Sequence, residues 1–354
     1  MLEVEDKPHI VDPTEALVPV PVTALEPIAR CFAPANGGPP LFIQHDESQA
    51  LSIDALIAWI GARRAVFDRL ILEHGGIVMR GFPVVTVADF DRLIGLFPAY
   101  DSGYAAGMSP RQKVTGKVLE STRMAEDFKI ILHSEMAYMK SYPPRIAFFS
   151  RQTSKTGGAT TIGSAREFLR RIPAPLREKL ERHKVHIIRN YAPKGSNSDA
   201  AKFDTHEKVG WDAAFFTDDP SEVERKCREF GMEFFWNDDG SLTLLDVSEP
   251  FTIHPKTGER FYRNNLHANR GADGKWGSNT SVTPAGAKRP SGQFLDNGEP
   301  LEPTEAETIR AILDEIEMRW QWHDGDIMIL DNLQVLHGRE TFTGPREVLV
   351  ALLD

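Results

Sequence analysis

The closing segment of the chain constrains its fold more than any other, because an apolar strand there is followed at short range by polar residues. A Gly-Asp pair at 325–326 precedes the apolar run 327–330, and His337 follows after a second short apolar stretch. Arg346 stands nine residues later, behind a Gly-Pro pair and before an apolar end. This order predicts two neighbouring strands with polar side chains at their ends. We therefore expect a ligand site between strands, completed by residues from upstream.

Short apolar segments bounded by Gly, Pro, Asn and Asp predict further strands, at 77–82, 145–149, 184–191, 241–247 and 260–266. Helices are predicted where Ser or Thr precedes an apolar repeat of helical spacing, from Ser52, Thr86, Ser164, Ser221 and Thr304. The last two starts have the form of a capping box, and the final helix is expected to hold an apolar stripe as far as Trp320. Non-contiguous strands with peripheral helices favour a mainly β fold, a cupin-like sandwich or barrel of the jelly-roll kind.

The chain of 354 residues is long for one domain, yet sandwiches and barrels of this length fold as one unit. Residues 1–50 are rich in proline and predict an extended lead-in with one strand, packed on the core. We expect residues 51–354 to form a single domain. The polar loop 194–212 is predicted to be a lid that excludes water, with a surface loop of no function as the alternative.

Composition excludes several classes of protein. With 41% hydrophobic and 26% charged residues, the chain matches soluble globular proteins. No apolar run is long enough to cross a bilayer, and the acidic N-terminus is unlike a signal peptide, so we expect a cytoplasmic protein without a membrane partner. The net charge of -10 opposes attraction to phosphate backbones, and no nucleic-acid partner is expected.

Pairs of the form His-x-Glu place two ligand-capable side chains on one face of an extended segment. The chain has two such pairs, His45/Glu47 and His133/Glu135. The first lies between a Pro/Gly-rich stretch and a predicted helix, which is typical of a solvated loop. The second follows the apolar run 130–132 and so emerges from a strand end, where the mouth of a sandwich would place a site. We expect the second pair to bind a metal.

His337 is the expected third ligand because it too follows an apolar strand. Two histidines and one carboxylate form the facial triad that holds Fe(II) and leaves positions open for a cosubstrate and oxygen. Arg346, on the next predicted strand, is placed to bind a carboxylate in the same cavity through two hydrogen bonds. Considered alone, His337 could equally be a structural histidine, and Arg346 could equally form a surface salt bridge. Their occurrence together favours a site.

Six short motifs, in order from about residue 65 to the end, resemble the TauD/TfdA family of Fe(II)/2-oxoglutarate-dependent oxygenases. These motifs are Arg80-Gly81-Phe82, His133-Ser134-Glu135-Met136, Gly157-Gly158-Ala159-Thr160-Thr161, Asp331-Asn332, His337-Gly338-Arg339 and Phe342-x-Gly344-Pro345-Arg346. Two further segments, 211–216 and 254–264, resemble the syringomycin hydroxylase branch, which acts on amino acids during nonribosomal peptide assembly. The family fold is a double-stranded β-helix, in agreement with the jelly roll expected from the strands.

The resemblance implies that His133, Glu135 and His337 are the iron ligands and form the catalytic centre. Glu135 departs from the commoner aspartate. Halogenating relatives have a small residue at this position, which opens a site for chloride. A carboxylate therefore favours hydroxylation, with desaturation and epoxidation as alternatives that use the same cofactors.

The resemblance also implies a cosubstrate site. Arg346 is expected to bind the distal carboxylate of 2-oxoglutarate, and Thr160, in the Gly-Gly-x-Thr motif, to donate a hydroxyl hydrogen bond to it. The spacing from His337 to Arg346 is shorter than in the taurine enzyme, which leaves Arg339 as a possible substitute.

The implied reaction is hydroxylation of an amino acid or amino-acid derivative, free or held on a peptidyl carrier protein, with decarboxylation of 2-oxoglutarate to succinate and CO2. It requires Fe(II), 2-oxoglutarate and O2. Arg123, Arg189 and Asn264 lie near the motifs and are predicted to bind the substrate, with a satisfied structural role as the alternative for each. Two other classes stay open: a sandwich that binds metal or ligand without turnover, and a cupin-type isomerase or hydrolase, against which a dicarboxylate-binding Arg346 argues.

Overall fold

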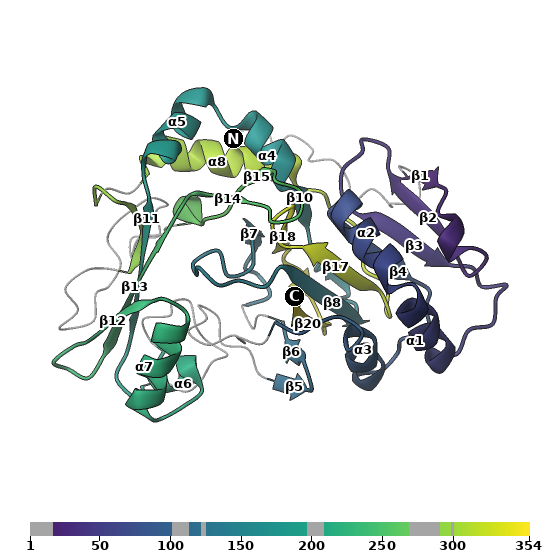
Figure 1. Ribbon diagram of the computed structural model, residues 1–354, viewed down its shortest axis with the longest axis horizontal. Helices are drawn as coiled ribbons and strands as arrows, with labels where there is room; N and C mark the ends of the chain where they lie inside the picture. Colours follow the sequence, from purple (N-terminus) through teal and green to yellow (C-terminus); the bar gives the residue numbers. More distant parts are fainter. Residues whose placement is uncertain (1–16, 101–112, 122–124, 197–208, 269–290, 299–300) are drawn as a thin grey trace.

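The computed structural model describes residues 17–100, 113–121, 125–196, 209–268, 291–298 and 301–354. In Figure 1 a large sheet lies beside a group of helices near the N-terminal strands, and a second group of helices lies along the top of the view. The middle of the chain forms a separate sheet at one end.

The large sheet has nine strands in the order β1 (Leu17–Val20), β2 (Ala29–Pro34), β3 (Leu41–His45), β4 (Gly76–Arg80), β17 (Ile327–Asp331), β8 (Arg145–Gln152), β20 (Glu347–Leu353), β6 (Val118–Glu120) and β5 (Lys113–Thr115). β3 and β4 pair in parallel, and the other described pairs of this sheet are antiparallel. The apolar run predicted near the C-terminus is therefore the central strand, β17.

A smaller sheet faces the large one and has the order β10 (Ile162–Ser164), β18 (Val335–Arg339) and β7 (Ile130–His133). The ring of Phe148 on β8 lies 5.3 Å from the ring of His337 on β18, edge to face, which joins the two sheets. Two facing, mainly antiparallel sheets with helices outside them confirm the predicted jelly-roll, double-stranded β-helix fold.

Alternate residues of β17 enter two different cores, as the two-residue period of a strand requires. Ile327 and Ile329 pack with apolar residues of the helices α1 (Ile53–Ala62), α2 (Arg64–His74) and α3 (Val87–Ile94). Met328 and Leu330 face the other way and pack with Leu336 of the small sheet. The strand is buried on both sides, so it is a rigid base for the turn that follows it.

The remaining helices are α4 (Ala165–Arg171), α5 (Ala174–Arg182), α6 (Trp211–Phe215), α7 (Pro220–Glu229) and α8 (Pro303–Ile316). The predicted N-caps at Ser52, Thr86 and Ser164 are confirmed, because each side chain accepts a hydrogen bond from a backbone N–H of the first turn.

The predicted starts of α7 and α8 are wrong by two residues. Asp219 caps α7 and Glu302 caps α8, each followed by a proline at the first helical position. Proline fits there because its missing N–H would have had no helical partner. The predicted apolar stripe also outruns its helix, since α8 ends at Ile316 and the buried Trp320 lies beyond it.

The middle of the chain forms a four-stranded antiparallel sheet in the order β12 (Glu233–Trp236), β13 (Leu242–Ser248), β11 (Val185–Tyr191) and β16 (Gly292–Leu295). A hairpin of β14 (Phe251–Ile253) and β15 (Arg260–Tyr262) connects this sheet to the segment that leads back toward the site. A second, short pair joins β9 (Thr156–Gly157) to β19 (Phe342–Thr343).

The N-terminal segment differs from its prediction. Where one strand was expected within residues 1–50, the structure has β1, β2 and β3, and all three extend the large sheet. His45, expected on a solvated loop, ends β3, and its ring lies 3.2 Å from the carbonyl of Gly81. A single domain over 51–354 remains a prediction, and residues 197–208 of the predicted lid lie outside the described residues.

Among the described residues, no helix combines the length and apolar character that crossing a bilayer requires. The cytoplasmic location stays a prediction.

Candidate metal and cosubstrate site

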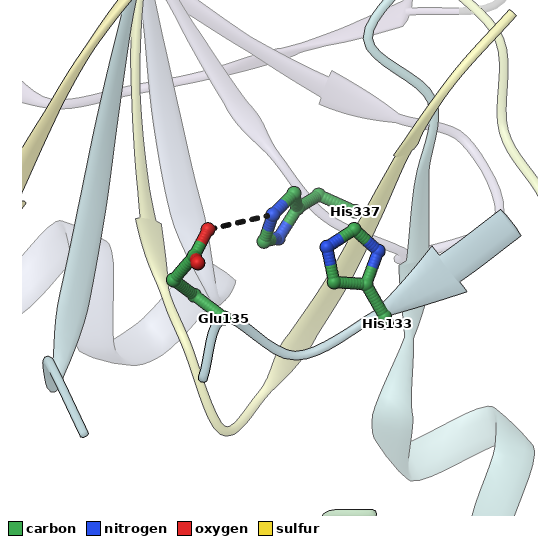
Figure 2. Close-up of side chains that lie close together, drawn as sticks. All are labelled: His133, Glu135 and His337. Atoms are coloured by element: carbon green, nitrogen blue, oxygen red, sulfur yellow. Dashed lines mark ion pairs between the residues drawn. The ribbon is translucent and has the colours of Figure 1, made fainter. Parts of the chain in front are cut away.

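His133, Glu135 and His337 come together between the two sheets. His133 ends β7 and pairs directly with His337 on the adjacent strand β18, with ring centroids 4.5 Å apart. Glu135 lies just after β7, and its Oε2 is 3.6 Å from Nε2 of His337. Figure 2 shows the carboxylate directed at the His337 ring, with the His133 ring beside it. One ligand atom from each side chain lies within 4.8 Å of the others, so one ion can contact all three.

The hydrogen bonding of the two histidines fits a metal. Nδ1 of His133 lies 2.9 Å from the carbonyl of Ile131. A carbonyl only accepts, so Nδ1 carries the proton and Nε2 keeps its lone pair, the arrangement typical of ligating histidines. Nδ1 of His337 is buried and has no hydrogen-bond partner among the described residues. The two rings and a buried carboxylate are the donor set that suits Fe(II).

Asn332 holds the backbone of Glu135. Its Oδ1 accepts from the Glu135 N–H at 2.7 Å, and its Nδ2 donates to the carbonyls of Glu135 at 3.0 Å and Pro143 at 2.8 Å. Met136, the next residue, has the left-handed φ of +53°, which costs a residue with a Cβ roughly 1–2 kcal/mol. The turn after β17 thus fixes the unusual backbone that carries the carboxylate ligand.

Arg346 has the surroundings of an anion site. Its Nε donates to the carbonyl of Gly158 at 2.8 Å, and its Nη2 lies 3.4 Å from Oγ1 of Thr160. Within the described part of the chain, no carboxylate lies within ion-pair distance of this guanidinium. Burial lowers the pKa of Arg346 to about 10, and the positive charge of Arg339 acts in the same direction. A partly buried cation without a protein counter-charge favours an anionic ligand.

Thr160 is set to donate a hydrogen bond. Its Oγ1 accepts from the indole N–H of Trp322 at 2.9 Å and lies near Arg346, and both neighbours are donors. Its own proton therefore suits an acceptor such as a carboxylate. Gly158 is required beside it, because φ is +75° and an added Cβ would lie 3.1 Å from the Arg346 side chain.

Arg339 has a different arrangement from Arg346. Its Nη2 donates to the backbone carbonyls of Ala125 at 2.6 Å and Phe128 at 2.8 Å, which anchors the segment leading into β7. Its guanidinium lies 5.1 Å from the Phe342 ring, and that of Arg346 lies 5.5 Å from the same ring. Arg339 therefore adds positive charge to the region while its hydrogen bonds hold backbone. Direct binding of 2-oxoglutarate by Arg339 stays a prediction.

Two other motif residues have structural partners. Arg80 forms a bidentate ion pair with Asp326, through bonds of 3.1 and 2.8 Å, and so joins β4 to the turn before β17. Asp331 accepts from Nε2 of His254 at 2.9 Å, while Nδ1 of His254 accepts from two backbone N–H groups. These pairs fix the two ends of β17.

The three predicted substrate residues are not brought together in the described structure. Arg123 lies outside the described residues. Arg189 is buried in the middle sheet, and its Nη2 is 2.5 Å from Oδ2 of Asp246. Asn264 donates to the carbonyl of Pro250 at 3.1 Å and accepts from the N–H of Leu266. Arg189 and Asn264 have the partners expected of structural residues, so their substrate role stays a prediction.

Sequence reasoning missed two buried residues near the triad. Arg263, next to Asn264, donates to two backbone carbonyls of the loop that carries Glu135. Burial lowers the pKa of His267 to about 3, with smaller effects from the charges of Arg310 and His133, so its ring is neutral. Arg263 lies inside the segment 254–264 that resembles the amino-acid hydroxylases, but nothing in that resemblance assigned it a role, and His267 lies outside every motif.

The fold and the three grouped side chains define a class of protein, a jelly roll with a site for one metal ion between its sheets, and comparisons with known proteins narrow this class. Residues 39–352 match the model of the taurine catabolism dioxygenase TauD, TfdA family. The chain belongs to this family.

Several relatives are similar over most of the chain. A clavaminate synthase-like protein from Arabidopsis thaliana is 25% identical over 347 residues, which cover 98% of this chain and 93% of the relative. The dapdiamide synthesis protein DdaC from Enterobacter agglomerans is 26% identical over 289 residues, covering 81% and 84%. Among solved structures, PvcB from Pseudomonas aeruginosa has a TM-score of 0.48 at 14% identity, covering 88% and 85%.

The protein is therefore an Fe(II)/2-oxoglutarate-dependent dioxygenase that uses O2. When bound, the iron and the keto acid supply the oxidising chemistry, and the protein supplies orientation and exclusion of water. The residues present fit this pair of groups, since His133, Glu135 and His337 offer the metal ligands and Arg346 offers the cation.

Proposed function

We propose that this dioxygenase hydroxylates an amino acid or an amino-acid derivative, either free or held on a carrier protein. His133, Glu135 and His337 hold the iron, and Arg346 binds the distal carboxylate of 2-oxoglutarate with help from Thr160. The observation that carries the cosubstrate assignment is the cationic Arg346 without a carboxylate partner among the described residues.

Hydroxylation is supported by the side chain at position 135. Glu135 is 2% exposed, and its carboxylate lies in the ligand group beside His337. A carboxylate in that place occupies the position that a halide would need. Transfer of oxygen to a C–H bond is then the expected outcome.

An amino-acid substrate is supported by the segment 254–264, which resembles the amino-acid hydroxylases and borders the site. His254 binds Asp331 in the turn that precedes His337, and Arg263 binds the loop that follows Glu135. Among the relatives, the name of one refers to dapdiamide synthesis and that of another to clavaminate synthase, in keeping with natural-product biosynthesis.

The test is an anaerobic titration with Fe(II) and 2-oxoglutarate, followed by the metal-to-ligand absorption band. A panel of free amino acids and of amino acids loaded on a carrier protein is then added. The proposal expects a member of the panel to shift the band, and admission of O2 to give succinate together with a product bearing one added oxygen atom.

Two results would overturn the proposal. Succinate formation that persists without Fe(II), or in the His337→Ala variant, would remove the cofactor assignment. A band that shifts only with compounds outside the amino-acid panel would leave the dioxygenase in place and reject the substrate class.

A further inference from the structure

The loop from Ser134 to Pro143 carries Glu135 and is held from two sides. On one side Asn332 binds the backbone of Glu135 and the carbonyl of Pro143. On the other side Arg263 reaches in from the end of β15, and Tyr100 forms a hydrogen bond with Ser141 farther along the loop. Nη2 of Arg263 donates to the carbonyls of Met136 at 2.8 Å and Met139 at 2.7 Å.

The charged side chain of Arg263 binds backbone carbonyls rather than a carboxylate. The side chain is buried, with 3% of the residue exposed, and its guanidinium lies 3.6 Å from the centre of the Tyr142 ring. Among the described residues, no carboxylate is within ion-pair distance of it. Burial lowers the pKa of Arg263 to about 10, so the group stays charged at neutral pH. Charge-assisted donors of this kind bind carbonyls more strongly than neutral ones do.

The carbonyl that Arg263 binds belongs to the residue with unusual backbone. Met136 is left-handed, and its carbonyl also accepts from the N–H of Met139 at 3.0 Å. Because Met136 directly follows Glu135, the orientation of its peptide groups sets the direction in which the Glu135 side chain leaves the backbone. A left-handed residue with a Cβ persists only where its surroundings enforce it.

The anchor of Arg263 is firm. Its own N–H donates to the carbonyl of Pro250 at 3.0 Å, and Asn264 donates to the same carbonyl. The hairpin before it is tied to the turn after β17 by the buried His254–Asp331 pair. These contacts hold the backbone of Arg263 in place, so its guanidinium can hold the loop of Glu135.

We propose that Arg263 is a positioning residue for Glu135, which holds the left-handed turn after it and so aims the carboxylate at the metal. The hairpin β14–β15 and the residue that follows it are then part of the metal centre, although they supply no ligand. This inference rests on the proposed role of Glu135 as a ligand and is independent of the identity of the substrate.

The experiment measures Fe(II) affinity under anaerobic conditions, without 2-oxoglutarate, by competition with a chromogenic chelator. Arg263→Met keeps the volume and removes the donors, and Arg263→Lys keeps the charge. Arg64→Met is the control, because Arg64 also donates to a backbone carbonyl, that of Leu96, and lies 4.0 Å from the Phe97 ring, but on the outer helix α2. Unlike Arg263, it also forms an ion pair with Asp68 at 2.9 Å, so its loss tests stability away from the loop of Glu135. Circular dichroism and thermal melting of the metal-free proteins report the fold.

Loss of an outer partner of a ligand weakens metal binding by roughly 10- to 100-fold, and we expect this for Arg263→Met, with partial recovery in Arg263→Lys. Arg64→Met should keep wild-type Fe(II) affinity while losing thermal stability. Wild-type affinity in a folded Arg263→Met protein would overturn the inference and reduce Arg263 to a stabilising residue. If Arg263→Met does not fold, the test passes to Arg263→Lys, which loses the guanidinium that binds both carbonyls. Wild-type Fe(II) affinity in Arg263→Lys would also overturn the inference.

Glu135→Ala separates this inference from the assignment on which it rests. If that variant binds Fe(II) as tightly as the wild type, the ligand role of Glu135 fails. If Glu135→Ala loses Fe(II) and Arg263→Met does not, only the positioning role fails.

Discussion

The strands that carry the candidate metal ligands and the sheet in the middle of the chain bury their polar side chains in different arrangements. His133 at the end of β7, Glu135 just after it and His337 within β18 converge on one point, and the two histidines offer ring nitrogens suited to a metal. In the middle sheet, the buried Arg189 is matched at 2.5 Å by Asp246 on the neighbouring strand. Metal-binding side chains that converge on one point indicate function, whereas an opposite-charge pair buried between neighbouring strands indicates structure.

Removing one ligand should give the largest effect. His337→Ala leaves two of the three ligands, and we expect Fe(II) affinity to fall by more than the roughly 100-fold typical of outer partners, with loss of turnover. The fold should persist, because β18 keeps its backbone pairing with β10 and β7 when the ring contact with Phe148 is lost. An anaerobic Fe(II) titration and circular dichroism check both points. A variant with unchanged Fe(II) affinity would show that the converging group is itself structural.

Removing the Arg189–Asp246 ion pair should lower the free energy of unfolding rather than Fe(II) affinity. Arg189→Met leaves Asp246 buried without its partner, and breaking such a pair costs about 3–5 kcal/mol of unfolding free energy. Adding Asp246→Leu should recover most of that loss, because an apolar pair replaces the ion pair. Urea unfolding measures both variants. If Arg189→Met keeps wild-type stability but weakens substrate binding, Arg189 contacts the substrate as the sequence predicted, and the contrast between the two regions is lost.

Much of the site was predictable because its signals are local. The apolar run 327–330, the His-x-Glu pair at 133–135 and the Gly-Gly-x-Thr motif each lie within a few residues of sequence. Strand periodicity and turn residues likewise indicated the jelly roll. The predicted grouping of His133, Glu135 and His337 appears in the structure, where strand pairing places His133 opposite His337.

What sequence did not reveal depends on distant partners. Arg263 and Asn264 are adjacent, yet only Arg263 contacts the loop of Glu135. The sequence could not distinguish the two residues, because the direction of a side chain along an irregular segment has no sequence signature. The N-caps of α7 and α8 were misplaced for a local reason, since an acidic residue followed by proline competed with the Ser and Thr two residues later. Two of the three N-terminal strands were missed because prolines such as Pro19 in β1 and Pro34 at the end of β2 disfavour a strand in the sequence pattern.

Loss of Arg346, the cation proposed to bind the cosubstrate, should give an intermediate effect. Arg346→Met removes a charge-assisted contact worth about 1.5–3 kcal/mol, so the Michaelis constant for the keto acid should rise by about 10- to 100-fold while Fe(II) affinity is kept. Arg151→Met is the control, since its exposed ion pair with Glu347, on the same sheet, should matter by less than about 1 kcal/mol. Initial rates at varied keto-acid concentration measure both variants. A normal Michaelis constant in Arg346→Met together with a raised one in Arg339→Met would transfer the role to Arg339.

The smallest effect is expected on the surface of the middle sheet. Phe235 lies on the edge strand β12 and is 51% exposed, so Phe235→Ala should change the free energy of unfolding by less than about 0.5 kcal/mol. Leu244, fully buried on β13, is the contrast, and its replacement by alanine should cost about 2–5 kcal/mol. Urea unfolding compares the two, and turnover with free and carrier-bound substrate is measured for Phe235→Ala. Unchanged turnover with free and with carrier-bound substrate would mean that the middle sheet has a structural role. A loss of turnover confined to the carrier-bound substrate would instead mean that the edge strand β12 contacts the carrier protein. The middle sheet would then have a structural ion pair in its interior and a binding surface at its edge.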